Sequence, residues 1–143
     1  MIKVTVDIQI NRRAADVFAY ISNFANNPKW QKGMVEAYYT TEPPIRVGSE
    51  YTQVARFLGR NIESTFKVIE YNPGRLIKAT TLKSTFPITF ARFVEPNDNG
   101  CLLTTIVEGD ASGVYKLTEP LLRNKVRSSI QQDYERLKKL LEN

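Results

Sequence analysis

Residues 117–141 read LTEPLLRNKVRSSIQQDYERLKKLL, and their pattern decides the fold of the whole chain. This spacing predicts an amphipathic α-helix with one apolar stripe, since apolar residues recur in steps of three to five. At 1.5 Å per residue the helix would be roughly 35 Å long, the width of a small domain. A stripe of that length needs an equally long partner surface, and upstream only β-strand patterns can provide one. The residues of the stripe are Leu117, Leu121, Val126, Ile130, Tyr134, Leu137 and Leu141.

A shorter helix is predicted near the amino terminus, within residues 11–24 (NRRAADVFAYISNF). Val17, Phe18 and Ile21 fall at helical spacing there, and Asn11 is a candidate N-cap because its side-chain oxygen can accept from a free backbone N–H. The segment follows an alternating stretch and precedes a polar, turn-rich one, so we expect only two or three helical turns.

Most of the remaining chain alternates with a period of two, as β-strands with one buried face do. Residues 25–33 differ: they should form a loop or a short helical turn, because Asn27-Pro28 breaks a longer helix. Gly59-Arg60 is a hairpin signal and Asn72-Pro73-Gly74 a turn signal. Seven strands are predicted, at residues 3–10, 34–39, 50–58, 61–71, 75–82, 86–95 and 101–109.

Consecutive strands joined by short turns predict an antiparallel meander. A sheet this large must curl or be covered on one face, and the long helix is the available cover. The predicted fold class is α+β: a seven-stranded curved antiparallel sheet gripping a long C-terminal helix, with one or two short helices after the first strand. Residues 1–143 are expected to form a single domain, because this length accommodates one hydrophobic core.

Composition is that of an ordinary globular protein, with 42% hydrophobic and 24% charged residues. No apolar run approaches the roughly 18 residues that a membrane span requires. The amino terminus, MIKVTVDIQINRR, alternates and has no apolar signal region, so it is interpreted as a strand and not a signal peptide. Cytoplasmic residence is the expected default.

Several kinds of chemistry are excluded by residue type. Histidine is absent, which removes the usual general base and a common metal ligand. Cys101 is the single cysteine, so a disulfide within the chain and a cysteine metal cluster are excluded. No acid/base dyad or phosphate-binding glycine loop is found. We therefore expect no metal, no cofactor and no identifiable catalytic residue, and any reaction would depend on carboxylates, Tyr, Lys or Arg.

The net charge is +5, from 20 basic and 15 acidic residues. Residues 115–143 contribute +3 of it, seven basic residues against four acidic ones. The basic side chains of this segment could bind nucleic acid or an anionic surface. Because the signs are interleaved along the helix, a solvated helix face is the favoured interpretation over nucleic-acid binding. The oligomeric state, a homodimer included, stays open.

Strand alternation selects candidate ligand-binding residues. On residues 50–58 the inward set is Tyr51, Gln53, Ala55 and Phe57. On residues 61–71, where the polar and apolar faces separate most cleanly, the inward set is Ile62, Ser64, Phe66 and Val68. Gln53 and Ser64 are polar groups among apolar neighbours. A buried polar group needs a partner, which could be a ligand, a neighbouring side chain or water.

For other candidates alternation leaves the inward direction open, and on residues 86–95 both faces are apolar. If Val35 points inward, then Ala37 and Tyr39 do as well. Arg92 shares a face with Phe86, Ile88 and Phe90, and buried there it would recognise an anion; an exposed arginine at the strand end is the favoured alternative. The predicted ligand-binding set is Trp30, Tyr39, Tyr51, Gln53, Phe57, Ser64, Phe66, Phe90, Arg92, Tyr115, Leu122 and Val126, with Trp30 favoured as a core anchor and Cys101 as a small buried residue.

The chain resembles the START-like (SRPBCC) superfamily, and within it the bacterial members similar to polyketide cyclases/dehydrases. The resemblance is carried by four segments in the same order over nearly the whole chain. They are RRAADVFAYISNFANNPKW (12–30), RVGSEYTQVARFLGRNIESTFKVIEYNPGRLI (46–77), FARFVEPNDNGCLLTTIVEGDASG (90–113) and LLRNKVRSSIQQDYERLKKLLE (121–142).

The resemblance implies a helix-grip fold, with a hydrophobic cavity between the sheet and the C-terminal helix. It also implies an apolar ligand such as a lipid, a polyketide or an aromatic compound. No catalytic residue can be transferred, because the acid/base residues of the cyclases are not fixed across the superfamily. The predicted function is binding of an apolar small molecule; the alternatives are a cyclase/dehydratase-type enzyme using Tyr, Arg or carboxylate chemistry, and a protein or RNA interaction module.

The apolar stripe of the final helix thins at Ser128 and Ser129, beside Ile130. A helix that served only as core would carry large side chains along its full length. Small residues at its middle leave space, and we therefore predict that the cavity lies there.

Overall fold

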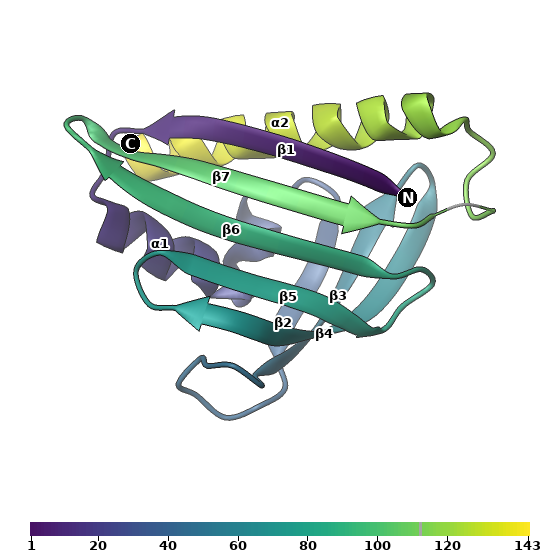
Figure 1. Cartoon of the computed structure of the whole chain (residues 1–143), viewed down its shortest axis with the longest axis horizontal. Coiled ribbons are helices and arrows are strands. Elements are labelled where there is room, and N and C mark those ends of the chain that lie inside the picture. The colour runs from purple at the N-terminus through teal and green to yellow at the C-terminus, as the bar shows by residue number, and fades with distance from the viewer. Residues whose placement is uncertain (112) are drawn as a thin grey trace.

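The computed structural model describes residues 1–111 and 113–143 (Figure 1). It confirms the predicted order of one strand, one or two short helices, six strands and one long helix, and the short helices are two. The elements are β1 (Ile2–Ile10), α1 (Ala14–Ser22), the 3-10 helix η1 (Phe24–Lys29), β2 (Met34–Tyr39), β3 (Glu50–Phe57), β4 (Arg60–Asn72), β5 (Leu76–Lys83), β6 (Ile88–Asn97), β7 (Gly100–Gly109) and α2 (Glu119–Glu142).

The seven strands form one antiparallel sheet in the order β1-β7-β6-β5-β4-β3-β2. From β2 to β7 each strand pairs with the next in the chain, and β1 pairs with β7. The β3–β4 turn lies one residue earlier than predicted: Leu58 (φ 49°) and Gly59 (φ 81°) form it, and Arg60 already pairs with Phe57. Two consecutive positive φ angles match the twist that a two-residue hairpin requires.

The sheet curls, and α2 runs alongside β1 at one side of the curve (Figure 1). Among the strands, α2 approaches β1 most closely. The strands at the other end of the sheet order, β2, β3 and β4, lie further from the helix. This separation leaves space between the helix and the inner sheet face for side chains and a cavity.

The apolar stripe on α2 was predicted with an error at its amino-terminal end. The helix begins at Glu119, so Leu117 precedes it and is 39% exposed, and Leu121 is 52% exposed. Leu122 is buried instead. Its spacing of four residues places it above Val126, which faces the same side of the helix. Further along, Tyr134 and Leu137 are buried as the stripe predicts.

Asn11 is not the N-cap of the first helix, contrary to the prediction. The helix begins after Arg13, and the Asn11 backbone N–H donates to Glu142 Oε2 at 2.8 Å. The chain between β1 and α1 is thereby held against the end of α2. The apolar residues Val17, Phe18 and Ile21 are buried, as their spacing predicts.

Val35 is 61% exposed, so its predicted inward direction is wrong. A register shift between Met34 and Glu36, where β2 pairs with β3, inserts one residue into the strand. Such a bulge reverses the alternation on one side of it. Ala37 is buried and Tyr39 half-buried, and both keep the inward direction that was expected.

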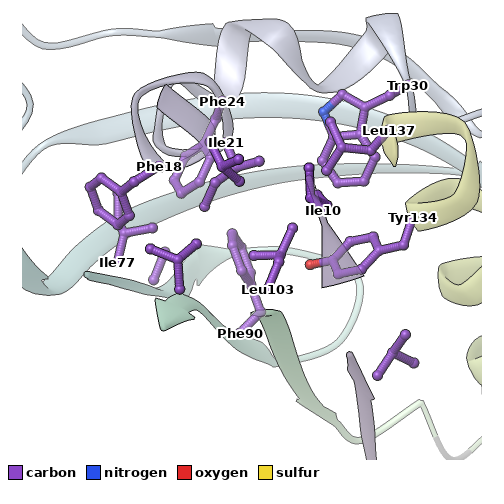
Figure 2. Packing of buried hydrophobic residues seen from close by; sticks show 14 of the residues in the cluster. Ile10, Phe18, Ile21, Phe24, Trp30, Ile77, Phe90, Leu103, Tyr134 and Leu137 are labelled. Atoms are coloured by element: carbon purple, nitrogen blue, oxygen red, sulfur yellow. The ribbon is translucent and has the colours of Figure 1, made fainter. Parts of the chain in front are cut away.

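The main hydrophobic core lies where α1, η1 and the carboxyl-terminal half of α2 meet the sheet. Trp30 is 2% exposed there, which agrees with the core-anchor interpretation, and its ring centroid lies 5.4 Å from that of Tyr134 (Figure 2). A second, smaller cluster of Ile2, Ala111 and Leu122 packs at the other end of α2. The helix is thus supported at both ends by buried side chains.

Candidate ligand-binding cavity

A cavity of about 190 Å³ lies between the inner sheet face and α2. The sheet contributes apolar side chains, and the helix contributes Leu122, Val126 and Ile130 with the small Ser129 between them. Ser129 is thus part of the wall, at the point where the stripe thins, whereas Ser128 is exposed. The lining residues are Ile2, Gln53, Ala55, Phe57, Ile62, Ser64, Phe86, Ile88, Val107, Gly109, Ala111, Tyr115, Leu122, Val126, Ser129 and Ile130.

Strand register explains the sheet wall. Gln53 lies directly opposite Ser64 on the neighbouring strand, and Ala55 lies opposite Ile62. Side chains of directly opposed residues share a face of the sheet. The alternation predicted for these two strands is therefore the alternation observed.

The two polar groups of this wall differ in how they are bonded. Ser64 Oγ and Ser84 Oγ lie 2.6 Å apart, so the Ser64 hydroxyl is satisfied within the protein. The Gln53 side chain forms no hydrogen bond with any described residue. Between these two residues of the sheet wall, the Gln53 amide is therefore the one with free donors and acceptors.

A second chamber of about 140 Å³ adjoins the first and lies deeper, toward the main core. It shares four wall residues with the outer chamber and adds several polar ones. The shared residues are Gln53, Ile88, Val107 and Ile130, and the added residues are Gln31, Met34, Phe66, Phe90, Arg92, Thr105 and Tyr134.

Arg92 is 4% exposed, so the favoured prediction of an exposed arginine is wrong. It lies within β6, opposite Ile77 on one side and Thr105 on the other, and α1 and η1 cover this part of the sheet. Its Nη1 donates to Ile21 O and to Asn27 Oδ1, each at 2.9 Å.

Aromatic rings surround the Arg92 guanidinium. Its Cζ lies 5.0 Å from the Trp30 ring centroid and 5.3 Å from those of Phe24 and Phe90. Cation–π attraction of this kind partly compensates for lost hydration. No acidic side chain of the described residues forms an ion pair with this guanidinium.

The buried tyrosines near Arg92 remain protonated at neutral pH. Burial raises the pKa of Tyr51 and of Tyr134, and the nearby Arg92 charge opposes this only in part. Neither hydroxyl has a hydrogen-bond partner of full geometry, although Thr105 and Arg92 lie close to that of Tyr134. These groups can donate hydrogen bonds, but they are poor bases.

Asp133 is the buried acidic residue among those described, yet it does not line the inner chamber. It accepts from the Lys32 backbone N–H at 3.1 Å and forms an ion pair with Arg136. Burial nevertheless raises the pKa of Asp133, because these two interactions compensate only in part for lost hydration.

Most of the predicted ligand-binding residues are brought together. Trp30, Tyr39 and Tyr51 line neither chamber: Tyr39 donates to Ser22 O at 2.8 Å, and Tyr51 stacks on Phe66 at 5.1 Å between ring centroids. The outer chamber contains Gln53, Phe57, Ser64, Tyr115, Leu122 and Val126, and the inner one contains Gln53, Phe66, Phe90 and Arg92.

Sequence reasoning missed several wall residues. The alternation of β7 could have identified Thr105 and Val107, since they share a face with the buried Leu103. Tyr134 was placed on the apolar stripe without a role in the cavity. Gln31 and Met34 lie in and just after a loop without any periodic signal, so no sequence pattern pointed to them.

A surface groove leads toward the outer chamber between the β2–β3 edge and α2. Phe57 and Ser129 belong to both the groove and the chamber. The groove is lined by exposed basic residues, Lys32, Arg56 and Lys125, together with the exposed Val35 and Leu58. An apolar interior thus adjoins a basic entrance.

None of the helices that the structure describes is both long and apolar enough to cross a membrane.

Comparison with known proteins gives one family match. Residues 1–142 match the family model described as polyketide cyclase / dehydrase and lipid transport. No curated protein matches the sequence.

Solved structures are similar over almost the whole chain. A START superfamily protein from Mycobacterium smegmatis superposes with a TM-score of 0.82 at 12% identity, covering 98% of this chain and 97% of that one. The protein TTHA0849 from Thermus thermophilus gives 0.80 at 10% identity, covering 96% and 95%. The di-domain ARO/CYC BexL from the BE-7585A biosynthetic pathway gives 0.76 at 18% identity, covering 99% of this chain and 47% of that one. At these identities the likeness establishes the fold.

Proposed function

The chain belongs to the polyketide cyclase/dehydrase and lipid transport family, and from this premise we propose that it binds an apolar small molecule between its sheet and α2. The observation that carries the proposal is the largely apolar cavity that passes from the basic groove to Arg92. Lipids, polyketides and other aromatic compounds are the ligand classes that such walls fit. Burying about 200 Å² of apolar ligand surface contributes roughly 5 kcal/mol before the cost of association.

The residue types in the walls support binding over catalysis. No Asp, Glu, Lys or Cys lines either chamber among the described residues, and the chain has no His. A general base must lie within hydrogen-bond reach of the proton that it removes. The protonated tyrosines and Arg92 can hold a ligand's polar atoms, but they do not accept its protons at neutral pH.

A panel of apolar compounds tests the proposal by thermal shift and native mass spectrometry. The panel should include medium-chain acyl compounds and aromatic polyketides. We expect at least one compound to raise the melting temperature and to remain bound in the gas phase. The variant Ser129→Phe should abolish this binding by filling the outer chamber, whereas Asn124→Phe, on the exposed side of α2, should not. Binding that survives Ser129→Phe would place the ligand elsewhere.

A second candidate function is a cyclase- or dehydratase-type reaction. It is favoured by the presence of Arg92 and Tyr134 in one chamber, since both could polarise a ligand carbonyl by donating hydrogen bonds. Incubation with a linear polyketide analogue, followed by mass spectrometry of the small molecule, separates the two functions. A product formed faster with the wild type than with Arg92→Met supports catalysis; recovery of unchanged compound supports binding alone.

Cytoplasmic residence, the oligomeric state and the absence of nucleic-acid binding stay predictions from the sequence. Cell fractionation, light scattering and an RNA-binding assay at low salt respectively would test them.

A further inference from the structure

The inner chamber has a chemistry different from that of the outer one, and it points to one class of ligand. We infer that the cavity selects an apolar molecule with a terminal carboxylate, which binds Arg92 while the apolar body fills the outer chamber. This inference rests on the proposed function and specifies the ligand of the same site.

The positive charge of Arg92 lacks an acidic partner. The guanidinium is 4% exposed, and none of the ion pairs among the described residues includes it. Asp133 is the buried carboxyl whose field reaches it, but that group bonds Lys32 N and Arg136. A buried charge without a partner is costly, and a ligand anion in the chamber would supply the missing one.

The hydrogen-bonding groups around Arg92 are also incomplete. Nη1 is used by Ile21 O and Asn27 Oδ1, whereas Nε and Nη2 donate to no described residue. A guanidinium edge with two free donors matches the two oxygens of a carboxylate. The Tyr134 hydroxyl, which Figure 2 shows pointing from α2 into the cluster, lies close to Arg92 and Thr105 but has no partner of full geometry among the described residues, so it can donate to the same carboxylate.

Gln31 is, beside Gln53, a further polar residue of the chamber without a hydrogen-bond partner among the described residues. Its buried Oε1 accepts no hydrogen bond from any residue that the structure describes. Rotation of the amide exchanges its oxygen and its NH₂ group, so the side chain can donate to a ligand oxygen. Arg92, Tyr134 and Gln31 together present donors from β6, α2 and the segment after η1.

The entrance groove has the matching charge. Lys32, Arg56 and Lys125 are exposed at the groove, and none forms an ion pair with a described residue. A cleft lined by charges of one sign raises the local concentration of the opposite ion. The basic groove therefore favours entry of an anion, and the apolar outer chamber requires that the rest of the ligand be apolar.

Two acid–ester pairs test the inference by calorimetry: decanoate with methyl decanoate, and 2-naphthoate with methyl 2-naphthoate. The members of each pair share an apolar body and differ in charge, and the two pairs differ in shape. We expect the wild type to bind an acid at least about tenfold more tightly than its ester, as a charge-assisted hydrogen-bond pair requires. Arg92→Met should remove that preference by lowering acid affinity far more than ester affinity, since the neutral ester accepts the weaker hydrogen bonds.

A second variant covers the case in which Arg92→Met does not fold. Tyr134→Phe removes one hydroxyl donor and keeps the ring, and we expect it to lower acid affinity several-fold and ester affinity by less, because a carboxylate accepts stronger hydrogen bonds than a neutral ester carbonyl. Equal affinity for acid and ester in the wild type would overturn the inference and leave the proposed function standing. Failure of both pairs and of the whole apolar panel to bind would instead reject the proposed function itself.

Discussion

Tyr39 and Tyr51 face each other across β2 and β3, with ring centroids 5.7 Å apart, but their hydroxyls differ in bonding. Tyr39 donates to Ser22 O at 2.8 Å, whereas the Tyr51 hydroxyl is fully buried and has no hydrogen-bond partner among the described residues. An unsatisfied buried hydroxyl opposes folding, and a satisfied one favours it. The two residues therefore form a matched pair in which the same substitution should have opposite effects.

The first prediction is that Tyr51→Phe raises the free energy of unfolding by about 1 kcal/mol, while Tyr39→Phe lowers it by about the same amount. The first change removes a polar group that bonds nothing. The second leaves the Ser22 carbonyl without its donor. Urea unfolding of the two variants and the wild type measures both effects. A loss of stability in Tyr51→Phe would mean that its hydroxyl bonds an internal water.

Asp133 carries a pH dependence whose sign follows from its environment. Burial raises the pKa of Asp133 above its ordinary value of 3.8, against the opposing effects of the Lys32 N–H and Arg136. The folded protein then binds this proton more tightly than the unfolded chain does. The contribution of Asp133 to the free energy of unfolding therefore falls as the pH rises from about 3.8 through the higher pKa of the folded state.

The second prediction compares the wild type with Asp133→Asn, which has no proton to release and can still accept from the Lys32 N–H. The wild type should lose stability relative to this variant as the pH is raised across that window. Urea unfolding at a series of pH values from about 3.5 upward measures the difference, in which the other carboxyl groups largely cancel. A difference that grows in favour of the wild type would show that the Arg136 ion pair outweighs burial.

At the scale of elements, the β6–β7 turn packs tightly against the end of β1. Gly100 has φ +137°, and a Cβ there would collide with Ile10 O and lie 2.7 Å from Arg12 N. Backbone atoms cannot move aside as a flexible side chain can. Gly59, in the β3–β4 turn, also has positive φ (+81°) but would meet no atom within 4 Å.

The third prediction is that Gly100→Ala costs about 3 kcal/mol of stability, because it combines backbone strain with a steric clash. Gly59→Ala, with strain alone, should cost about 1 kcal/mol. Urea unfolding of both variants measures the contrast. Equal losses of stability in the two variants would mean that the β6–β7 turn can shift away from β1 without a loss of free energy.

Periodicity predicted the elements well because each has one buried face. Alternation on β3 and β4 correctly predicted that Gln53 and Ser64 face the interior, where both line the cavity. It failed at Val35, because a bulge changes the strand register without leaving a sequence signal. Periodicity also placed Leu121 on the buried stripe, where the structure has Leu122. Adjacent helix positions differ by about 100°, and the wide step from Leu121 to Val126 allowed the stripe to pass through either leucine.

The burial of Arg92 could not be predicted from its own strand. Alternation placed it on one face with Phe86, Ile88 and Phe90 without deciding which face is inward, and the covering elements α1 and η1 lie more than sixty positions earlier in the chain. Its hydrogen-bond partners Ile21 and Asn27 are separated from it by 71 and 65 positions. Long-range contacts of this kind determine the inner chamber, and they leave no local pattern in the sequence.

For the whole molecule, the distribution of the core determines how binding and stability are coupled. One large cluster lies under α1 and η1, and a small one lies at the amino-terminal end of α2, with the outer chamber walled partly by the latter. A ligand that fills the space adds contacts between α2 and the sheet that the unfolded chain cannot make. Binding should therefore suppress global unfolding.

Cys101 offers a direct measure of this coupling, because it is the single cysteine and is fully buried in β7. Burial also raises the pKa of its thiol, which lowers the thiolate fraction available for reaction. The fourth prediction is that DTNB labels the native protein only through unfolding, and that a ligand present at about 100 times its Kd slows labelling by about 100-fold. Labelling rates are measured across a urea series, where a steep dependence on denaturant identifies global unfolding. The control is Ser129→Phe, which fills the chamber, so that added ligand should not change its labelling rate. Fast labelling that is insensitive to both urea and ligand would show that the end of β7 opens locally and independently of the cavity.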